Sequence, residues 1–556
     1  MSVTTADAPA ATPAAAPNMK LVVAASAAGT AFEWYDFFVF GSLAVILADV
    51  FYSGLNETAR FIVALATFAV GFAARPFGAL VFGKIGDQSG RKGAFLITIS
   101  LMGVATFLIG LLPSYEQIGI IAPLLLIVLR ITQGLALGGE YGGAAIYVAE
   151  HAPDHQRGAW TSWIQTSAAI GLVGALGVIL LTRTIVGEAD FRAWGWRIPF
   201  LVSLGLLAIS LWIRLKLKES PTFVAMKEAG EGTKTPFKDT FGRWKNLRIV
   251  LLALFAIMTA QGAVWYSGYF YAQFFLERVL KVEPATVNGV LIAVSIVTAA
   301  LYVFFGWLSD KVGRKPIMLL GMILSVLTLF PGFKLLTEAA NPALAEAART
   351  APVVVRADPS ECSLQFDPVG GSRFTTSCDL AKAVLASGGI PYENEAAPAG
   401  TIAQVRVGGT TIESRSAAGL DAAGAKAVRT DVETRVKAAL TAAGYPAKAD
   451  PAEIDLTRVF LLLLLFMTAA TALYGPQAAA LVELFPTSIR YTGMSLPYNI
   501  GTGWVGGFLP ASAFALVAAP GDLYFGLWYP VLFTLSAIIV AVLFLPETKG
   551  RRLNEI

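Results

Sequence analysis

The chain has 556 residues, of which 56% are hydrophobic and only 14% are charged. Because about a quarter of the residues of a soluble protein are charged, this composition excludes an ordinary soluble protein and indicates a chain that crosses a membrane several times. Two histidines and two cysteines leave little for metal or thiol chemistry, and with a net charge of only +4 we expect no nucleic-acid partner.

The first 19 residues are rich in Ala, Pro and Thr and lack the basic start of a signal peptide, so we expect a disordered cytoplasmic tail. Beyond it, twelve apolar runs have the length of about 20 residues that crosses roughly 30 Å of hydrocarbon. They lie near residues 21–50, 61–82, 94–112, 120–149, 159–182, 198–215, 249–277, 286–306, 317–336, 457–482, 493–518 and 523–545. Because barrel strands are only about ten residues long and alternate in polarity, we predict an all-α membrane protein of twelve transmembrane helices.

Two landmarks occur twice in the chain. The motif Gly-x-x-x-Asp-x-x-Gly-Arg-Lys stands at residues 83–92 and again at 306–315, each time between two apolar runs. A glutamate followed seven residues later by an arginine occurs at Glu150 and Arg157, and again at Glu483 and Arg490. Matching landmarks in two halves predict a duplicated protein with two pseudo-symmetric six-helix bundles.

The two landmarks are unequally spaced, because the motif copies are 223 residues apart and the Glu-Arg pairs 333. The second half therefore holds an insertion of about 110 residues, and its long polar stretch is 337–455. The predicted organisation is a tail (1–19), a first bundle (20–215), a linker (216–248), helices seven to nine (249–336), the insertion (337–455), helices ten to twelve (456–546) and a second cytoplasmic tail (547–556).

Lys and Arg gather in the loops on one side of the predicted membrane, namely both motif copies, the linker and the residues after 546. Positive charge marks cytoplasmic loops. We therefore predict a bacterial inner-membrane protein with both termini in the cytoplasm, and the span count places the insertion in the periplasm.

Both cysteines, Cys362 and Cys378, fall within the insertion. An oxidising compartment permits a disulfide, worth about 3 kcal/mol in the chain-entropy model; two unpaired thiols are the alternative. Residues 353–356, 402–407 and 411–415 have strand composition, with Gly408-Gly409 as a hairpin turn, and 422–443 has helical composition. These patterns predict a small extracytoplasmic α+β module.

Charged residues inside apolar spans are informative, because each costs several kcal/mol unless it meets a partner or a water-filled cavity. Glu33 and Asp36 lie three residues apart in the first span and face nearly the same way. They are candidates for proton coupling, and the alternative is a fixed ion pair to a neighbouring helix. Glu140 in the fourth span either carries a proton too or pairs with Arg75 or Arg157.

Arg130 of the fourth span shares a narrow arc with Gln133 and Tyr141. An obligate cation with a polar neighbour suits a cavity that holds an anion. Arg75, closer to the cytoplasmic end of its span, either contacts substrate or snorkels toward the membrane surface. The same fourth span contains a small-residue seam that favours close helix packing, formed by Gly134, Gly138 and Gly142.

The second half offers aromatic and amide side chains in its spans, where aromatic residues at helical spacing are commonly packing or an interfacial belt. Gln261 and Tyr269 in the seventh span and Asn499 in the eleventh are candidates for lining a cavity. The predicted substrate-binding residues are therefore Arg75, Arg130, Gln133, Tyr141, Gln261, Tyr269 and Asn499.

The repeated motif has a simple structural interpretation: glycine for a tight turn, aspartate as a helix cap, and Arg-Lys following the charge bias. Its occurrence twice in full, with Asp and Arg four residues apart, makes this interpretation alone insufficient. The chain has no Gly-x-x-x-x-Gly-Lys-Ser/Thr sequence for ATP, so an ion gradient is the expected energy source.

These residues resemble the metabolite:H+ symporter branch of the major facilitator superfamily. The resemblance is carried by both motif copies and by Phe-Glu-Trp-Tyr-Asp-Phe at 32–37, Arg-Pro-Phe-Gly at 75–78, Arg-Ile-Thr-Gln-Gly at 130–134, Gly-Gly-Glu-Tyr at 138–141, Trp-Gly-Trp-Arg-Ile-Pro-Phe at 194–200, Lys-Glu-Ser-Pro at 218–221 and Glu-Leu-Phe-Pro-Thr at 483–487. It implies rocker-switch alternating access and proton-driven import without a cofactor. It also implies that Glu33, Asp36, Arg75, Arg130 and Gln133 line or control the cavity, and that Asp87 with Arg91 belongs to a cytoplasmic gate. To this gate we assign Gly83, Asp87, Gly90, Arg91, Lys92, Asp310, Arg314, Glu150, Arg157, Glu483 and Arg490.

We therefore predict a proton symporter, not an enzyme, that imports a small organic acid across the lipid bilayer and functions as a monomer. The insertion departs from shorter members of the branch. The chain also ends soon after Pro-Glu-Thr-Lys at 546–549, without the long tail of some osmolyte carriers, which favours an organic acid. The alternatives are import of a zwitterion such as proline or betaine, and a sensor whose external module binds a ligand.

Overall fold

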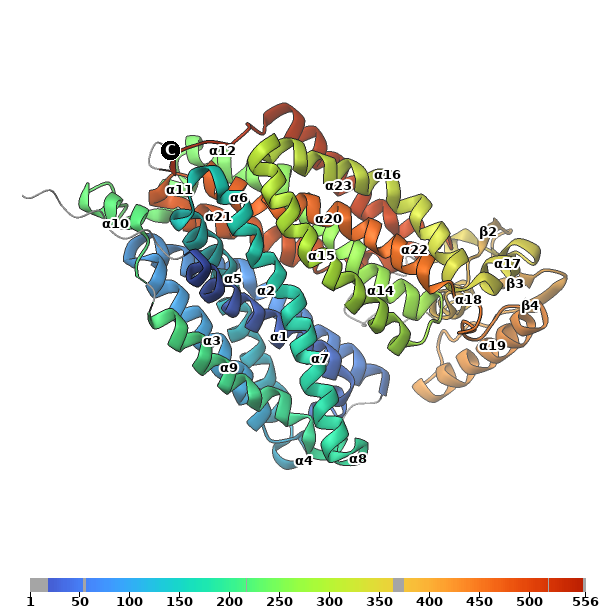
Figure 1. Cartoon of the computed structure of the whole chain (residues 1–556). Helices are drawn as coiled ribbons and strands as arrows, with labels where there is room; N and C mark the ends of the chain where they lie inside the picture. The colour runs from blue at the N-terminus through green and yellow to red at the C-terminus, as the bar shows by residue number, and fades with distance from the viewer. Residues whose placement is uncertain (1–18, 54–56, 217, 364–374, 519, 554–556) are drawn as a thin grey trace, which may run out of the picture.

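The computed structural model describes residues 19–53, 57–216, 218–363, 375–518 and 520–553. Two bundles of long helices lie side by side, and a small module with four strands projects from one end (Figure 1). The predicted tail lies outside the described residues except for Met19.

The first bundle begins with two 33-residue helices and contains the first copy of the motif between its second and third. Gly90 separates these two with φ +115, a backbone conformation that favours glycine. The helices of this bundle are α1 (Met19–Phe51), α2 (Glu57–Ser89), α3 (Arg91–Leu111), α4 (Tyr115–Ile118), α5 (Ile121–His151), α6 (Arg157–Ser162), α7 (Ser167–Val186), α8 (Glu188–Asp190) and α9 (Arg197–Leu215).

The linker contains two short helices, α10 (Pro221–Glu228) and α11 (Pro236–Phe241). Each starts with a proline, which fits the first helical turn because its missing N–H would have no partner there. Ser220 caps α10 by accepting a hydrogen bond from the Phe223 amide.

In the second bundle, the seventh predicted span is a continuous helical stretch with three π-helical segments. It runs through α12 (Trp244–Ala253), η4 (Leu254–Met258), α13 (Thr259–Tyr266), η5 (Ser267–Tyr271), α14 (Ala272–Phe274) and η6 (Phe275–Val279). The other long elements are α15 (Pro284–Val312), α16 (Arg314–Ala340), α20 (Leu456–Leu484), α21 (Arg490–Asn499), η9 (Ile500–Gly506), α22 (Leu509–Ala518) and α23 (Trp528–Phe544).

Among the described residues, nine helical stretches are long and apolar enough to cross a membrane. The other three predicted spans coincide with α1, α2 and the run from α21 through η9 to α22. Both α1 and α2 exceed the roughly 20 residues that a span needs, and they carry the charged residues that the sequence places inside the membrane.

The predicted glycine seam packs α5 against α2. A Cβ on Gly134 would lie 2.2 Å from the carbonyl oxygen of Gly71, and one on Gly138 would lie 2.2 Å from that of Arg75. Gly142 differs, because its Cβ would meet Ser495 of the second bundle. The seam therefore serves packing within the first bundle and, at its last glycine, contact between bundles.

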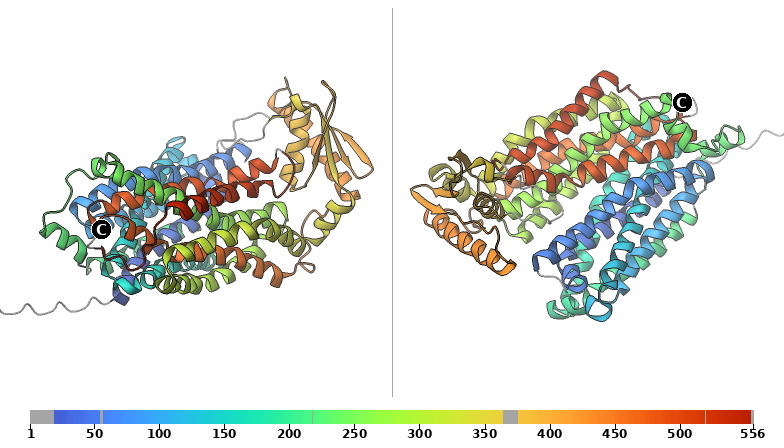
Figure 2. Two further views of the ribbon diagram at one scale, coloured as in Figure 1. Left: turned by 90° about the horizontal axis from the view of Figure 1, so that it is seen from above. Right: turned by 180° about the vertical axis from the view of Figure 1, so that it is seen from behind.

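Both motif copies lie at one end of the bundles, which we call the hinge end, and the strands lie at the other, the module end (Figure 1). The helices of the two bundles converge at the hinge end and diverge toward the module end (Figure 2). Contacts between α2 and α21 and between α6 and α15 join the bundles.

The module consists of a four-stranded sheet with helices packed on it. Its elements are α17 (Pro342–Thr350), β1 (Val353–Ala357), α18 (Ser377–Gly388), β2 (Glu393–Ala396), β3 (Gln404–Val407), β4 (Thr410–Glu413) and α19 (Ala422–Ala442). The strand order is β2-β1-β3-β4, with β1 and β2 parallel and the other pairs antiparallel. The sequence missed β2 because all four of its residues are exposed, which leaves no apolar alternation to detect.

The predicted disulfide is present between Cys362 and Cys378, which are 16 residues apart. It ties the segment after β1 to the start of α18, where Cys378 is fully buried. Closing a loop of this size stabilises a fold by about 3 kcal/mol in the chain-entropy model.

Replacing both cysteines by serine should lower the free energy of unfolding of the module by about 3 kcal/mol. Hydrogen exchange of the α18 amides in the full chain should then accelerate by roughly 100-fold. Amides of α5 serve as the internal control and should keep their protection, and unchanged exchange in α18 would show that the module does not depend on the disulfide.

Candidate functional site

Asp36 of α1 is the centre of a polar cluster inside the first bundle. Its Oδ1 accepts hydrogen bonds of 2.9 Å from Thr106 Oγ1 and 2.9 Å from Gln133 Nε2. Arg130 Nη1 lies 3.7 Å from Asp36 Oδ2 and donates to Gln133 Oε1 at 2.9 Å. The structure thus brings together three predicted site residues, and it adds Thr106 of α3, which sequence reasoning missed.

Glu33, one turn before Asp36, has a different partner. Arg75 Nη2 of α2 donates to Glu33 Oε1 at 2.9 Å, and the Arg75 guanidinium lies 5.2 Å from the centre of the Phe72 ring. Arg75 is only 7% exposed. It therefore does not snorkel toward the membrane surface, which was one of the two expectations.

Glu140 of α5 pairs with a residue that the sequence did not suggest. Arg214 Nη2 of α9 donates to Glu140 Oε1 at 2.6 Å, and Thr98 donates to Glu140 Oε2 at 3.0 Å. Of the two alternatives for Glu140, the one in which it pairs with Arg75 or Arg157 was wrong. Arg214 falls inside the predicted sixth span, so its position in an apolar run was the available signal.

The three arginines and three carboxylates therefore form matched pairs buried inside the first bundle. Removing one member of such a pair would leave an uncompensated buried charge, which costs several kcal/mol. The three pairs together carry no net formal charge, because each of their three guanidiniums faces a carboxylate.

Tyr141 belongs to a tyrosine group shared by the two bundles. Its ring stacks on Tyr498 of α21 with centroids 3.8 Å apart, and Tyr498 and Tyr474 share a hydroxyl hydrogen bond of 2.8 Å. Gln165 Nε2 donates to the Tyr141 hydroxyl at 2.8 Å. Tyr141, a predicted substrate-binding residue, thus contacts the second bundle directly.

A second aromatic group, which we call the aromatic layer, joins α1 and α2 to the seventh span. Trp34 lies 5.3 Å from Trp265, and Phe37 lies 5.5 Å from Phe270 between ring centroids. The layer consists of Trp34, Phe37, Phe72, Trp265, Tyr269 and Phe270. Tyr269 was predicted to line a cavity and stacks on Trp265 at 5.6 Å.

The buried amides of the second bundle fall into two kinds. Asn499 Nδ2 donates to the carbonyl oxygen of Gly138 in α5 at 2.9 Å, so this predicted lining residue lies in the contact between bundles. Gln477 lies beside the Tyr141 hydroxyl, whereas Gln261 Oε1 is buried with no hydrogen-bond partner among the residues that the structure describes. Because buried polar groups normally have partners, the Gln261 amide is suited to receive a polar ligand.

At the hinge end, Asp87 of the first motif reaches the other bundle. Its two oxygens accept hydrogen bonds from the backbone N–H groups of Tyr491 (3.0 Å) and Thr492 (2.9 Å) in the first turn of α21. Arg91 Nη1 donates to Asp87 at 2.7 Å, and Arg91 Nη2 donates to the carbonyl of Thr487 at 2.7 Å. A carboxylate at a helix N-terminus also interacts favourably with the helix dipole.

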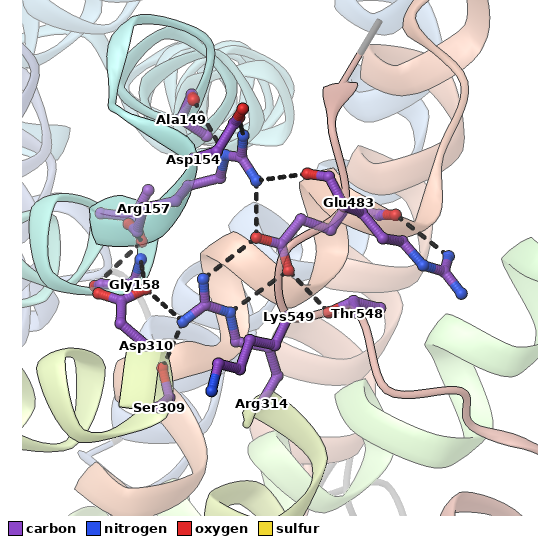
Figure 3. A network of polar contacts seen from close by, with 12 residues as sticks. Ala149, Asp154, Arg157, Gly158, Ser309, Asp310, Arg314, Glu483, Thr548 and Lys549 are labelled. Atoms are coloured by element: carbon purple, nitrogen blue, oxygen red, sulfur yellow. Dashed lines mark hydrogen bonds and ion pairs between the residues drawn. The ribbon is translucent and has the colours of Figure 1, made fainter. Parts of the chain in front are cut away.

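The second copy of the motif makes the reciprocal contact. Asp310 accepts from the backbone N–H groups of Gly158 (2.9 Å) and Ala159 (2.8 Å) in α6, and Arg314 Nη1 donates to Asp310 at 2.6 Å (Figure 3). Each bundle thus caps a helix of the other.

The Glu-Arg landmarks complete both networks. Arg490 Nη1 donates to Glu150 at 2.6 Å. Figure 3 shows the second pair, in which Arg157 Nη1 donates to Glu483 at 2.8 Å. Glu150 also lies 3.7 Å from Arg91, as Glu483 lies 3.1 Å from Arg314. All these carboxylates and guanidiniums are buried or nearly so, and they join the bundles at the hinge end.

Two further glutamates hold the motif itself and were not predicted. Glu219 accepts from the backbone N–H groups of Arg91 (3.0 Å) and Lys92 (3.2 Å). Glu547 does the same for Arg314 (2.9 Å) and for the following lysine. Both glutamates follow the last long helix of their bundle, Glu219 in Lys-Glu-Ser-Pro and Glu547 in Pro-Glu-Thr-Lys. This matching position in the two halves was the available sequence signal.

The motif glycines allow this close approach. A Cβ on Gly83 would lie 2.8 Å from the Thr492 Cα atom, and a Cβ on Gly90 would lie 2.3 Å from Glu219 Oε2. Within the described ranges, no group of three or more His, Cys, Asp or Glu side chains could hold a metal ion.

Comparison with known families gives two matches. The profile described as "Sugar (and other) transporter" matches residues 21–243 and 439–556, and the one described as "MFS/sugar transport protein" matches residues 143–353. Among solved structures, the proton:xylose symporter XylE bound to 6-bromo-6-deoxy-D-glucose superposes with a TM-score of 0.61 over 97% of this chain and 98% of that chain. At 15% identity this likeness concerns the fold alone.

Among curated proteins, the proline/betaine transporter of Escherichia coli (strain K12) is 40% identical over 333 residues, which are 58% of this chain and 65% of that protein. The match thus spans less than two thirds of that relative. A putative metabolite transport protein of Haemophilus influenzae is 31% identical over 549 residues, which are 97% of this chain and 96% of that protein. A match of this coverage includes most of the insertion.

Replacing Asp87 by Asn should shift the protein toward states in which the hinge end is open, because the cap on α21 loses its charge. Charge-assisted hydrogen bonds are worth about 1.5–3 kcal/mol, so we expect the open population to rise roughly tenfold or more. Spin labels on cysteines introduced at the exposed Ser89 and Lys311 should report this population as longer distances. The control is Glu188→Gln, an exposed carboxylate paired with Arg192; identical distance distributions in both variants would contradict a gating role for Asp87.

Proposed function

The chain belongs to the sugar (and other) transporter family of the major facilitator superfamily, and from this premise we propose that it imports a small zwitterionic solute together with protons. As a member of this family it is a membrane transporter and not an enzyme. We place it in a bacterial inner membrane, with the hinge end and both termini in the cytoplasm and the module in the periplasm.

The observation that carries the proposal is the neutral pairing of buried charge in the first bundle. Arg130 faces Asp36, Arg75 faces Glu33, and Arg214 faces Glu140. A substrate with one positive and one negative group leaves this balance unchanged, whereas an anion would bring an uncompensated charge into a region of low dielectric. The geometry thus supports the zwitterion better than the organic acid.

The aromatic layer supports the same substrate class. Phe72 of this layer contacts both Phe37 and the Arg75 guanidinium, so the layer lies next to the Glu33–Arg75 pair. A quaternary or secondary ammonium group binds favourably over aromatic ring faces. Proline/betaine transporters among the relatives agree with this inference.

Proton coupling is assigned to the carboxylates paired with arginine. When Asp36 takes a proton it loses its negative charge, and its attraction for Arg130 weakens. The Arg130 guanidinium can then bind the substrate carboxylate in place of Asp36, so that proton and substrate are carried together. Glu33 with Arg75 offers a second exchange of this kind, while Glu140 is held by Arg214 and Thr98.

Transport itself requires alternating access. The hinge-end networks close one side of the molecule in this conformation, and the bundles diverge toward the module end (Figure 2). A ligand shifts such an equilibrium only by binding the two states differently. The tyrosine group, with Tyr141 on one bundle and Tyr498 on the other, is placed to sense their relative movement.

An organic acid remains the second candidate substrate. Two arginines, Arg75 and Arg130, lie within the spans of the same bundle, and proton binding to either partner carboxylate would release positive charge for an anion. Because an anion brings negative charge of its own, this candidate needs one proton for each negative charge of the substrate to keep the region neutral.

Competition uptake into proteoliposomes should distinguish the two candidates. We expect excess unlabelled glycine betaine or proline to suppress uptake of labelled proline, and excess succinate to leave it unchanged, because the neutral site discriminates against net charge. Succinate uptake without proline uptake would establish the organic acid instead.

Asp36→Asn should abolish proton-driven accumulation while preserving exchange of substrate across the membrane. The amide mimics the protonated carboxyl, so the inside-to-outside ratio of labelled substrate should fall to about 1 under an imposed pH gradient. Asp49→Asn, which changes an exposed carboxylate of the same helix, is the matched control and should accumulate normally. Normal accumulation by the Asp36 variant would remove Asp36 from proton coupling.

A further inference from the structure

The hydroxyl of Thr106 on α3 lies at the middle of the Asp36 cluster. Thr106 is fully buried, and its Oγ1 atom lies 2.9 Å from each of three polar atoms. These are Asp36 Oδ1, the carbonyl oxygen of Met102 one turn earlier on α3, and Gln133 Nε2. A threonine hydroxyl has one proton to donate and two lone pairs that accept. It therefore donates either to Asp36 or to Met102, but not to both at once.

The ionised form of Asp36 selects the first of these arrangements. A carboxylate accepts hydrogen bonds and has none to donate, so Thr106 and Gln133 both donate to Asp36 Oδ1 at 2.9 Å. The second N–H of Gln133 Nε2 donates to Thr106 Oγ1. Met102 does not depend on the hydroxyl, because a carbonyl inside a helix already accepts a backbone hydrogen bond from the next turn.

A proton on Asp36 Oδ1 selects the second arrangement. The new O–H group donates to Thr106 Oγ1, and the Thr106 hydroxyl turns about its Cβ–Oγ1 bond to donate to the Met102 carbonyl. Gln133 Nε2 continues to donate to Asp36 and to Thr106. A buried donor without an acceptor is costly, and neither arrangement leaves one among these four groups. Asp36 can therefore take up a proton without the movement of a heavy atom.

The buried carboxylate of Glu140 has a similar threonine but a closer cation. Thr98 of α3 donates to it at 3.0 Å, and Arg214 Nη2 lies 2.6 Å from it. Arg130, by contrast, lies 3.7 Å from Asp36. The ionised Asp36 carboxylate thus relies on its threonine more than Glu140 does.

Arg130 is the charged group that faces Asp36. Outside the hinge-end networks, the other buried charges that the structure describes in the first bundle have partners of their own. They are Glu33 with Arg75 and Glu140 with Arg214, and at the surface of α7 Arg183 lies 3.8 Å from Glu188. Gln133 Oε1 also holds Arg130 Nη1, at 2.9 Å. When Asp36 loses its charge, Gln133 therefore keeps the Arg130 guanidinium in place for the substrate carboxylate.

We propose that Thr106 is a positioning residue that sets the protonation of Asp36, its hydroxyl turning between Asp36 and Met102 as the proton binds and leaves. This inference rests on the proton-coupling role proposed for Asp36. The bond from the hydroxyl to the charged carboxylate is the stronger of the two, because charge-assisted hydrogen bonds are roughly twice as strong as neutral ones. Thr106 thus favours the ionised form of Asp36 and promotes release of the proton after the substrate has crossed.

An infrared titration of the purified full chain tests this role without a substrate. The carbonyl stretch of protonated Asp36 is identified as the band that Asp36→Asn removes, and its intensity against pH gives the midpoint of protonation. Thr106→Val keeps the shape of the side chain but removes the donor to the carboxylate, so the midpoint should rise by about one pH unit. Thr106→Ala should shift it in the same direction. Thr106→Ser restores the hydroxyl and should return the midpoint to that of the unaltered protein.

Thr534→Val is the matched control, because Thr534 of α23 is also fully buried and donates to the carbonyl of Pro530 one turn earlier. It should leave the Asp36 midpoint unchanged. An equal midpoint in Thr106→Val, Thr106→Ala and the unaltered protein would overturn the role of Thr106 and leave Asp36 in proton coupling. A spectrum from which Asp36→Asn removes no band would overturn the switch together with the coupling role of Asp36. The substrate class is decided separately, by the competition uptake.

Discussion

The structure depends on one reciprocal interaction, in which an aspartate of each bundle accepts two backbone hydrogen bonds from the first turn of a helix in the other. Asp87 does so for α21 and Asp310 for α6. A carboxylate satisfies N–H groups that would otherwise lack partners at a helix start, and its charge is favoured by the helix dipole. Because these bonds cross between bundles, they can form only when the hinge end is closed, which makes them a natural element of a two-state switch.

The surrounding charges follow from the cost of burying Asp87 and Asp310. Each aspartate needs a cation, and Arg91 and Arg314 provide it from the next turn of the motif. Each arginine then lies near a second carboxylate, Glu150 or Glu483, which in turn binds an arginine of the other bundle. A buried network of this kind is stable only when every member is satisfied. Opening the hinge end must therefore break several charged contacts together, which suits an all-or-none transition.

Buried charges also need partners in the interior of the first bundle, but there the partners lie within one bundle. Asp36, Glu33 and Glu140 are each paired with an arginine on another helix, so charge balance there is maintained locally and not across the bundles. A proton or a substrate can exchange with one member of a pair without disturbing the hinge-end contacts. The charge pairs that we assign to transport are thus separate from the hinge-end contacts, whereas the aromatic layer joins the two bundles directly.

The sequence alone was sufficient to predict the family, the two-bundle architecture, the insertion and its disulfide, because apolar length, duplicated motifs and cysteine position are local or repetitive signals. It also identified Arg130 and Gln133 as neighbours on one face of a helix, because spacing on a helix determines which side chains face the same way, and it singled out Asp36 as a charge within an apolar span. It could not identify partners on other helices: Thr106 for Asp36, Arg214 for Glu140, or Gly138 for Asn499. It also missed β2, whose exposed residues lack a pattern. Such pairings were decided only by the tertiary structure, because they depend on the rotation and depth of helices distant in the chain, which the periodicity of one helix does not specify.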